Sequence, residues 1–260
     1  MAAPPLVSSR LHQILTHLPA ASYAFAYGSG VLTQPGLYNA RESQASTQSQ
    51  AKPTADSQAR GPQLDFILAV PDPSAWHAEN IRANPSHYSW VAQLGPRAVT
   101  GIAQHIGVGI HFNTLVNING QLVKYGVVGC NCLEDDLLTW RYLYVAGRLH
   151  KPVVHLVGRS QALAMAQAAN LRAAAATALL LLPPSFTTQD LLVKLVGLSY
   201  HGDVRMGLAE DPHKALTLQL RHQPGAALKA LTTLMLLAHP CLAHPLPQAT
   251  LSSQQQPIPS

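Results

Sequence analysis

Two short segments carry residue types that could bind a nucleotide phosphate and a metal ion. The first is Gly28-Ser29-Gly30, which follows an apolar run with alternating aromatic residues at positions 23–27. Glycines let a backbone approach a phosphate closely, and the amides and the Ser29 hydroxyl can donate hydrogen bonds to it. Taken alone, a Gly-Ser-Gly is more often an ordinary turn between elements.

The second segment is the apolar run LDFILAV at positions 64–70, which places Asp65 in a predicted buried strand. A carboxylate among apolar neighbours is costly unless it is paired or binds a cation. Asp65 is therefore a candidate metal ligand. The alternative is that it caps a nearby loop or lies on a strand edge.

Periodicity and turn signals predict the elements that must position these residues. Asn119-Gly120 between two apolar runs predicts a β-hairpin, because both turn positions need a positive φ. Thr187 and Asp190 predict a capped helix start. The further expected helices are 9–18, 76–84, 134–149 and 161–182, and the expected strands are 23–27, 64–70, 111–118, 121–128 and 153–157. Interleaved strands and helices indicate a mixed α/β (α+β) fold.

A strand that ends in Gly-Ser, followed by an acid on the next strand, resembles the core of the nucleotidyltransferase (polymerase β-like) fold. That resemblance implies that the turn holds a triphosphate and that strand carboxylates hold Mg²⁺. Members usually carry two acids separated by one residue. Here the partner position is Ile67, so a second carboxylate must come from elsewhere.

Eight blocks in order resemble the mitochondrial translocator assembly and maintenance family, also called the mitochondrial phosphatidate cytidylyltransferases. They extend over roughly residues 9–218. The blocks are YGSGV (27–31), LDFI (64–67), DP…WH…N (72–80), HYS (87–89), KYGV (124–127), LYVAGRL with KP (143–152), GLSY (197–200) and GDVRM (202–206). Together they are far more specific than any one of them.

The resemblance implies a reaction in which CTP and phosphatidic acid yield CDP-diacylglycerol and pyrophosphate, supplying cardiolipin synthesis. Asp65 is implied as a Mg²⁺ ligand, and Asp203 is the candidate for the missing carboxylate, although Gly-Asp also favours a plain turn. Lys124 is implied as a compact cation for the triphosphate. It otherwise belongs to the polar face of a strand.

Five residues are implied to bind substrate: Gly28, Ser29, Gly30, Arg148 and Lys151. Arg148 and Lys151 are equally suited to the C-terminal end of a helix, where cations are favourable. His77 and His87 are interpreted as structural, with His77 beside Trp76 and His87 hydrogen-bonded near Tyr88. A phosphate nucleophile that is already ionised gains little from a general base.

The composition limits the classes of binding partner that the protein is expected to have. The formal charge is +5, which suits an anionic partner such as a nucleotide or a phospholipid. Nucleic acid is disfavoured because no arginine-rich or aromatic surface is evident. The three cysteines indicate a reducing compartment. No apolar run reaches the ~20 residues of a membrane span, so we expect peripheral association, on the matrix side of the mitochondrial inner membrane by resemblance.

The expected organisation has four parts. Residues 1–20 form a transit segment or a first helix that packs through Leu11, Ile14, Leu15 and Leu18. Residues 21–158 form the nucleotidyltransferase-like domain with a disordered insertion at 39–62, residues 159–218 a helical region, and 219–260 a divergent low-complexity tail. Two alternatives stay open: an inactive truncated isoform that binds nucleotide or acts as an accessory protein, and a nucleotidyltransferase with another acceptor, such as RNA.

Overall fold

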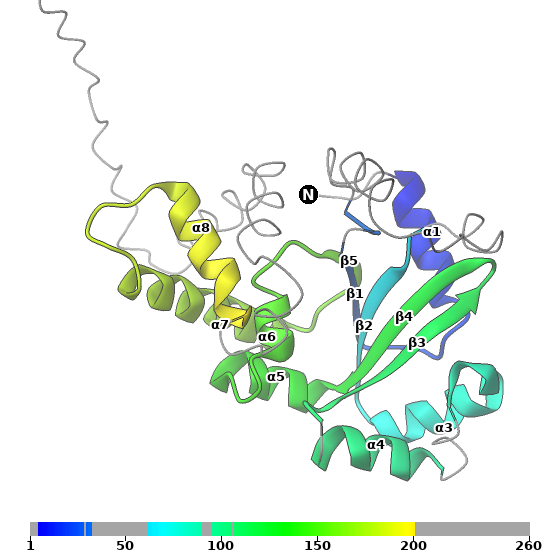
Figure 1. Cartoon of the computed structure of the whole chain (residues 1–260). Coiled ribbons are helices and arrows are strands. Elements are labelled where there is room, and N and C mark those ends of the chain that lie inside the picture. Colours follow the sequence, from blue (N-terminus) through cyan, green and yellow to red (C-terminus); the bar gives the residue numbers. More distant parts are fainter. Residues whose placement is uncertain (1–4, 29, 33–61, 90–94, 106, 201–260) are drawn as a thin grey trace, which may run out of the picture.

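The computed structural model describes residues 5–28, 30–32, 62–89, 95–105 and 107–200 (Figure 1). The predicted tail at 219–260 and nearly all of the predicted insertion at 39–62 lie outside these residues, as do residues 201–218 of the expected helical region. Within the described part, strands and helices alternate along the chain, which confirms the mixed α/β class. The elements are α1 (Pro5–Leu15), β1 (Tyr23–Tyr27), β2 (Leu64–Val70), α3 (Pro73–Ala83), η1 (Pro85–His87), α4 (Pro96–His105), β3 (Ile110–Ile118), β4 (Gln121–Gly129), α5 (Cys130–Thr139), α6 (Tyr144–Arg148), β5 (Val154–Val157), α7 (Gln161–Leu180), α8 (Thr188–Gly197) and η3 (Leu198–Tyr200).

The strands form one five-stranded mixed sheet in the order β3-β4-β2-β1-β5. Strands β2 and β4 pair in parallel, and the other three pairings are antiparallel. This arrangement is consistent with a nucleotidyltransferase-like core. All the strands that the sequence predicts are present, with bounds that differ by one residue at most.

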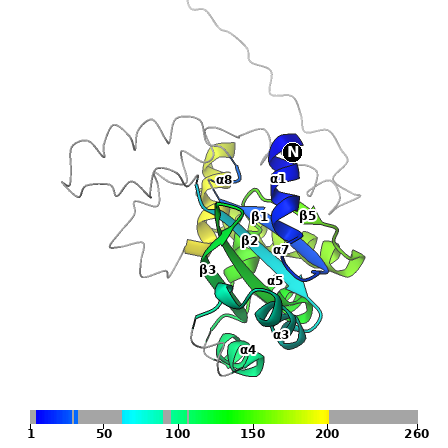
Figure 2. The ribbon, with the colours of Figure 1, turned by 90° about the vertical axis from the view of Figure 1, so that its right-hand side faces the viewer.

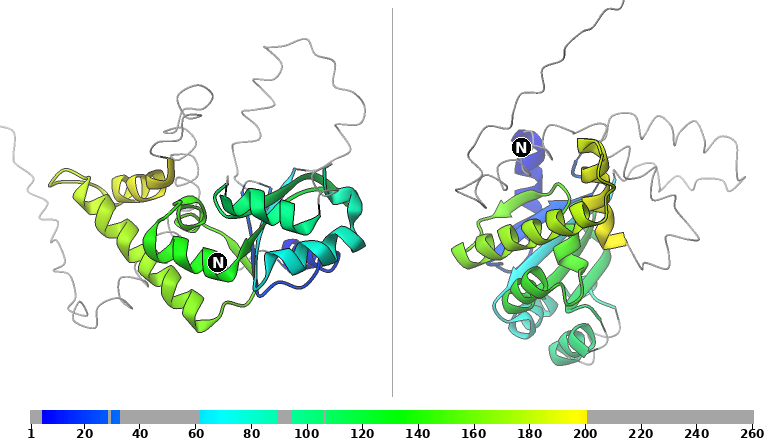
Figure 3. Two further views of the ribbon diagram at one scale, coloured as in Figure 1. Left: turned by 90° about the horizontal axis from the view of Figure 1, so that it is seen from below. Right: turned by 90° about the vertical axis from the view of Figure 1, so that its left-hand side faces the viewer.

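Helices cover both faces of the sheet (Figures 2 and 3). On one face, Phe66 and Tyr125 pack with Leu11 and Ile14 of α1 and with Trp76 of α3. The other face, which includes Phe25 and Ile67, packs with α5, α6 and α7. The packing predicted for the first helix is thus confirmed, since Leu11, Ile14 and Leu18 are buried and Leu15 is partly buried.

The hairpin prediction is confirmed by the backbone of its turn. Asn119 and Gly120 have φ values of 51° and 79°, as a two-residue turn that follows the strand twist requires. Strand β3 contains an irregularity that the sequence did not indicate. The register shifts between Asn113 and Val116, opposite Lys124, and Leu115 there has a φ of 59°.

The single helix predicted at 134–149 is wrong, because the chain breaks there into α5 and α6. Trp140 and Leu143 adopt left-handed backbone conformations, with φ values of 56° and 53°. The buried Asp136 carboxylate stabilises the break by accepting backbone N–H bonds of 2.8 to 3.1 Å. The donors are the amides of Tyr142, Leu143, Val145 and Ala146. These bonds satisfy the orphan donors at the start of α6.

Helices α7 and α8 pack against each other around a small core of their own, which includes Ala174, Ala178, Leu191 and Leu195. The cap predicted at Thr187 is confirmed as a capping box. The Thr187 hydroxyl accepts the Asp190 amide at 3.1 Å, and an Asp190 carboxylate oxygen accepts the Thr187 amide at 2.8 Å.

We predict that Asp136→Asn lowers the free energy of unfolding by about 2–4 kcal/mol, because an amide cannot accept all four backbone donors and leaves some of them buried and unsatisfied. Urea denaturation measures this change. The matched control is Asp135→Asn, which removes only an exposed ion pair with Arg141 at 3.8 Å. We expect the control to change stability by less than ~0.5 kcal/mol. Equal effects of the two substitutions would contradict the role given to Asp136.

Candidate active site

Three side chains lie in one row across the centre of the sheet. Tyr27 on β1 pairs with Asp65 on β2, and Asp65 pairs with Lys124 on β4. Residues paired across strands project from the same face of a sheet. The sheet therefore brings together three residues that are far apart in the sequence, on the face covered further along by α5, α6 and α7.

The glycine turn after β1 lies directly against β2. Gly28 has a φ of 85°, and a Cβ atom there would lie 3.1 Å from the Asp65 carboxylate. A Cβ atom at Gly30 would lie 2.2 Å from the backbone oxygen of Gln63, so no larger residue fits without moving β2. Gly28 is favoured by its positive φ, and Gly30 is required by its contact with the backbone of Gln63 just before β2. Ser29 lies outside the described residues.

Asp65 is partly buried and is held by one side chain. Gln63 donates a hydrogen bond from Nε2 to Asp65 Oδ1 at 2.9 Å. Burial raises the pKa of the Asp65 carboxyl, and this effect is opposed by the Gln63 hydrogen bond and the charges of Lys124 and Arg148. A carboxylate whose ionised form is disfavoured by burial gains most from a bound cation.

Gln63 was not among the residues predicted to line the site. Strand residues two apart share a face, so both Gln63 and Ile67 lie on the same face as Asp65. Ile67 is 1% exposed and belongs to the core, whereas Gln63 lies where β2 meets the glycine turn. The position that lines the site is therefore 63, occupied by an amide. The period-two spacing on the N-terminal side of Asp65 was the signal that could have found it.

Two cations lie near Asp65. The Lys124 Nζ atom is 4.7 Å from the centroid of the Phe112 ring on β3, and the Arg148 guanidinium carbon is 4.4 Å from the centroid of the Tyr27 ring. Both charges act on Asp65. The structure thus brings together Gly28, Asp65, Lys124 and Arg148, four of the residues that the sequence singled out.

The two other charged candidates, Lys151 and Asp203, are not among these residues. Lys151 is 6% exposed, and burial followed by the neighbouring Arg148 charge lowers its pKa to about 7. It therefore lies inside the protein, where burial disfavours its charged form. Asp203 lies outside the described residues.

The two histidines lie on the opposite face of the sheet, in a network around Tyr125. His77 packs against Trp76 with ring centroids 5.4 Å apart, and its Nδ1 is 2.7 Å from the Tyr88 hydroxyl. His87 Nδ1 is 2.9 Å from the hydroxyl of Tyr125, so its partner is not Tyr88 itself. Burial, with a smaller effect of His111, lowers the pKa of His77 to about 3. The predicted packing of His77 beside Trp76 is confirmed, and the structural role of both histidines stays a prediction.

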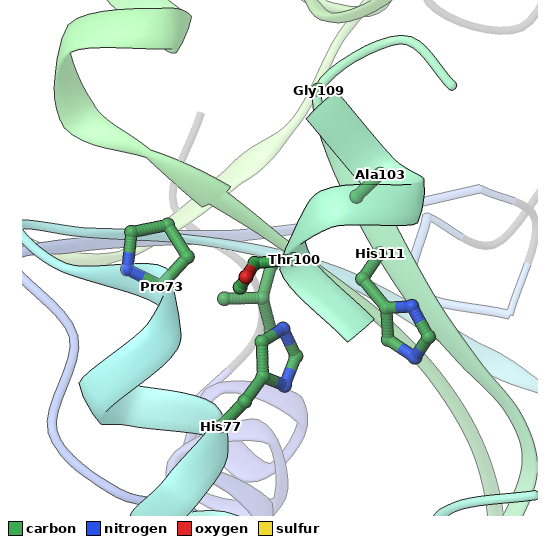
Figure 4. Close-up of a pocket in the computed structure, with 7 residues that line it drawn as sticks. Pro73, His77, Thr100, Ala103, Gly109 and His111 are labelled. Atoms are coloured by element: carbon green, nitrogen blue, oxygen red, sulfur yellow. The ribbon is translucent and has the colours of Figure 1, made fainter. Parts of the chain in front are cut away.

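A cavity of about 10 Å³ adjoins His77 (Figure 4). Its lining includes Thr100, Gly109 and His111, and the buried His77 Nε2 atom has no hydrogen-bond partner among the described residues. This space is comparable to one water molecule. It lies on the face opposite Asp65 and is far too small for a nucleotide.

The acidic, histidine and cysteine residues of the described part form no cluster of three or more that could hold a metal ion. Cys130 and Cys132 are free thiols, and Cys241 lies outside the described residues. Mg²⁺ in nucleotide enzymes is usually held by one or two carboxylates together with phosphate oxygens and water. Asp65 alone meets the lower limit of that donor set.

In the described residues, no helix is long and apolar enough to cross a bilayer.

Comparison with known proteins identifies close relatives. Residues 11–223 match the family described as phosphatidate cytidylyltransferase, mitochondrial. The human protein of that name is 42% identical over 208 residues, which cover 79% of this chain and 42% of the human one. The mouse protein is 43% identical over 210 residues, covering 80% and 57%. The Dictyostelium discoideum protein is 36% identical over 226 residues, covering 85% and 52%.

The chain thus spans about half the length of the curated relatives it matches. The matched region nevertheless contains every residue of the Asp65 row and its glycine turn. On this evidence, the chain belongs to the mitochondrial phosphatidate cytidylyltransferase family.

Proposed function

We propose that this chain transfers a cytidylyl group from CTP to phosphatidic acid. The observation that carries the proposal is the row of Asp65 and Lys124 on adjacent parallel strands, with the Gly28 turn against the carboxylate. Membership of a family whose relatives bear the name phosphatidate cytidylyltransferase supports the choice of substrates.

The proposed reaction is a single displacement at phosphorus. A phosphate oxygen of phosphatidic acid forms a bond to the α-phosphorus of CTP, while the bond from that phosphorus to the oxygen bridging to the β-phosphorus breaks. The products are CDP-diacylglycerol and pyrophosphate. The nucleophile is already ionised, so no proton has to be removed and positioning together with charge neutralisation supplies the catalysis.

Each residue of the row has a role in this proposal. The backbone turn at Gly28 and Gly30, with Ser29, holds the triphosphate. Lys124 and Arg148 supply positive charge toward the leaving pyrophosphate, and the buried Lys151 adds to this charge when it is protonated. Asp65, with Asp203 as the second carboxylate, would hold Mg²⁺, which supplies charge neutralisation for the phosphates when bound. Gln63 fixes the Asp65 carboxylate at 2.9 Å and so sets its orientation.

A lipid substrate requires that the enzyme work at a membrane surface. We propose peripheral association with the matrix side of the mitochondrial inner membrane, where the product supplies cardiolipin synthesis. The relatives are named as mitochondrial proteins, and the formal charge of +5 suits an anionic surface.

The direct test is transfer of labelled CTP into a chloroform-soluble product, with phosphatidic acid liposomes and Mg²⁺. We expect activity from the purified chain and a loss of at least ~1,000-fold in Asp65→Asn, because the metal loses its carboxylate. Asp135→Asn, an acid on the surface of α5, serves as the control and should retain activity. The absence of lipid product from folded protein would refute the proposed reaction. Label in an RNA acceptor instead would indicate a nucleotidyltransferase that acts on RNA.

Lys124→Met should lower kcat/KM by roughly 100-fold, the scale expected when one charge that stabilises a transition state is removed. The matched control is Arg82→Met, which removes an exposed cation on α3 whose Nε donates to the backbone oxygen of Ala78 at 3.2 Å. The same liposome assay measures both. An equal loss in the two variants would remove Lys124 from the site.

We further predict that Asp65→Asn stabilises the metal-free protein at pH 7. Burial raises the pKa of Asp65, so the ionised carboxylate costs stability in the folded state, and this cost disappears as the pH falls through the folded pKa. The difference in Tm between variant and wild type should therefore vanish in acid.

The opposite sign is expected for Asp190→Asn. The capping hydrogen bonds to Thr187 lower the pKa of Asp190, so its ionised form adds stability that is lost as the pH falls through the folded pKa. Thermal unfolding from pH 7 to pH 3 compares both. A lower Tm for Asp65→Asn than for the wild type at pH 7 would contradict the prediction that the ionised Asp65 carboxylate destabilises the metal-free protein.

A further inference from the structure

The connection between α7 and α8 displays apolar side chains to solvent. Leu180 is 87% exposed, Leu181 51% and Phe186 41%, and these three with Leu179 define the α7–α8 tip. Large apolar side chains gathered at one point are unusual on a soluble surface. The tip lies on the α7–α8 side of the molecule, away from β3 and β4 (Figure 1).

The two helices that carry the α7–α8 tip already pack against each other. Ala174 and Ala178 of α7 contact the core that includes Leu191 and Leu195 of α8. The capping box at Thr187 starts α8 directly after the connection. The exposed leucines of the tip therefore cannot turn into this core, because other side chains already fill it.

The α7–α8 tip carries no charged side chain, and cations lie further along both helices. The chain carries no charged residue between Arg172 and Asp190. Asp190 is engaged by Thr187, whose amide and hydroxyl both donate to its carboxylate. Arg172 is exposed and lies about 12 Å along α7 from Leu180, at 1.5 Å per residue. Lys194 is partly exposed and lies about 9 Å along α8 from its start at Thr188, on the same measure.

An uncharged apolar end with cations behind it matches the layers of an anionic bilayer. Apolar side chains are stable at the boundary between headgroups and acyl chains, while lysine and arginine are attracted to lipid phosphates. The long cationic side chains can reach the headgroup layer because their stems are apolar. A protein partner would need no such order of apolar and cationic groups.

We propose that the α7–α8 tip inserts into the headgroup region of a membrane that contains phosphatidic acid, with Arg172 and Lys194 contacting the lipid phosphates. The inference rests on the proposed function for the identity of the lipid. It adds a specific docking surface, separate from the Asp65 row.

The test is co-sedimentation of the full 260-residue chain with vesicles of phosphatidylcholine, with and without phosphatidic acid. The chain should bind more tightly when phosphatidic acid is present. The double substitution Leu180→Asp with Leu181→Asp should lower the partition coefficient by at least about tenfold, since burial of even one leucine is worth that much. Arg172→Gln with Lys194→Gln should reduce the preference for phosphatidic acid.

The matched control is Met165→Asp, which places the same charge on an apolar residue of α7 that is 65% exposed. Met165 lies about 22 Å from Leu180 along the helix. The control should bind vesicles like the wild type. Equal losses in the control and the tip variant, or full binding by the tip variant, would overturn the proposal.

Two measurements without vesicles separate this inference from the proposed reaction. Calorimetric titration with Mg²⁺ and CTP should give the same affinity for the tip variant and the wild type. If CTP fails to bind while the tip still directs vesicle binding, the reaction is refuted and the docking surface stands. Sedimentation equilibrium tests the competing occupant, because a dimer that the tip variant dissociates would assign this surface to a second copy of the chain.

Discussion

The in-register parallel pairing of β2 with β4 is the contact on which the site depends. It places Asp65 beside Lys124 and, through β1 on the other side, beside Tyr27 and the Gly28 turn. Burial disfavours the ionised carboxylate, while the two cations and Gln63 oppose that effect. A register shift of one residue would turn Asp65 to the opposite face. The apolar residues on both sides of Asp65 fix the register, because each face of the sheet is covered by helices.

The break between α5 and α6 has a comparable importance for Arg148. Asp136 gathers four backbone amides at the start of α6, and the short helix then carries Arg148 to the ring of Tyr27. Gly147 permits α6 to contact the segment after α8, since a Cβ atom there would lie 2.2 Å from the Cβ of Ser199. A buried acid with no chemical role thus positions a cation of the proposed site.

Much of this arrangement was predictable from local sequence. Alternating apolar runs identified the strands, Asn119-Gly120 the hairpin, and Thr187 with Asp190 the start of α8. The division of 134–149 into two helices was not predictable, because Trp140 and Leu143 have no intrinsic preference for a left-handed backbone. They adopt it in a turn that the Asp136 carboxylate holds by accepting the amides of Tyr142 and Leu143. Gln63 was missed for a related reason. Its role depends on where β2 begins relative to the glycine turn, which is a property of the sheet.

The central claim is that the row of Asp65 and Lys124 binds the triphosphate of CTP together with a divalent cation. A crystal structure of the chain with Mn²⁺ and a CTP analogue whose α–β bridge is a methylene group tests it most directly. Our account predicts anomalous density for the metal at the Asp65 carboxylate, about 2.1 Å from an oxygen, with phosphate oxygens at the Gly28 turn and near Lys124. A nucleotide bound elsewhere, or a metal that does not contact Asp65, would contradict the account.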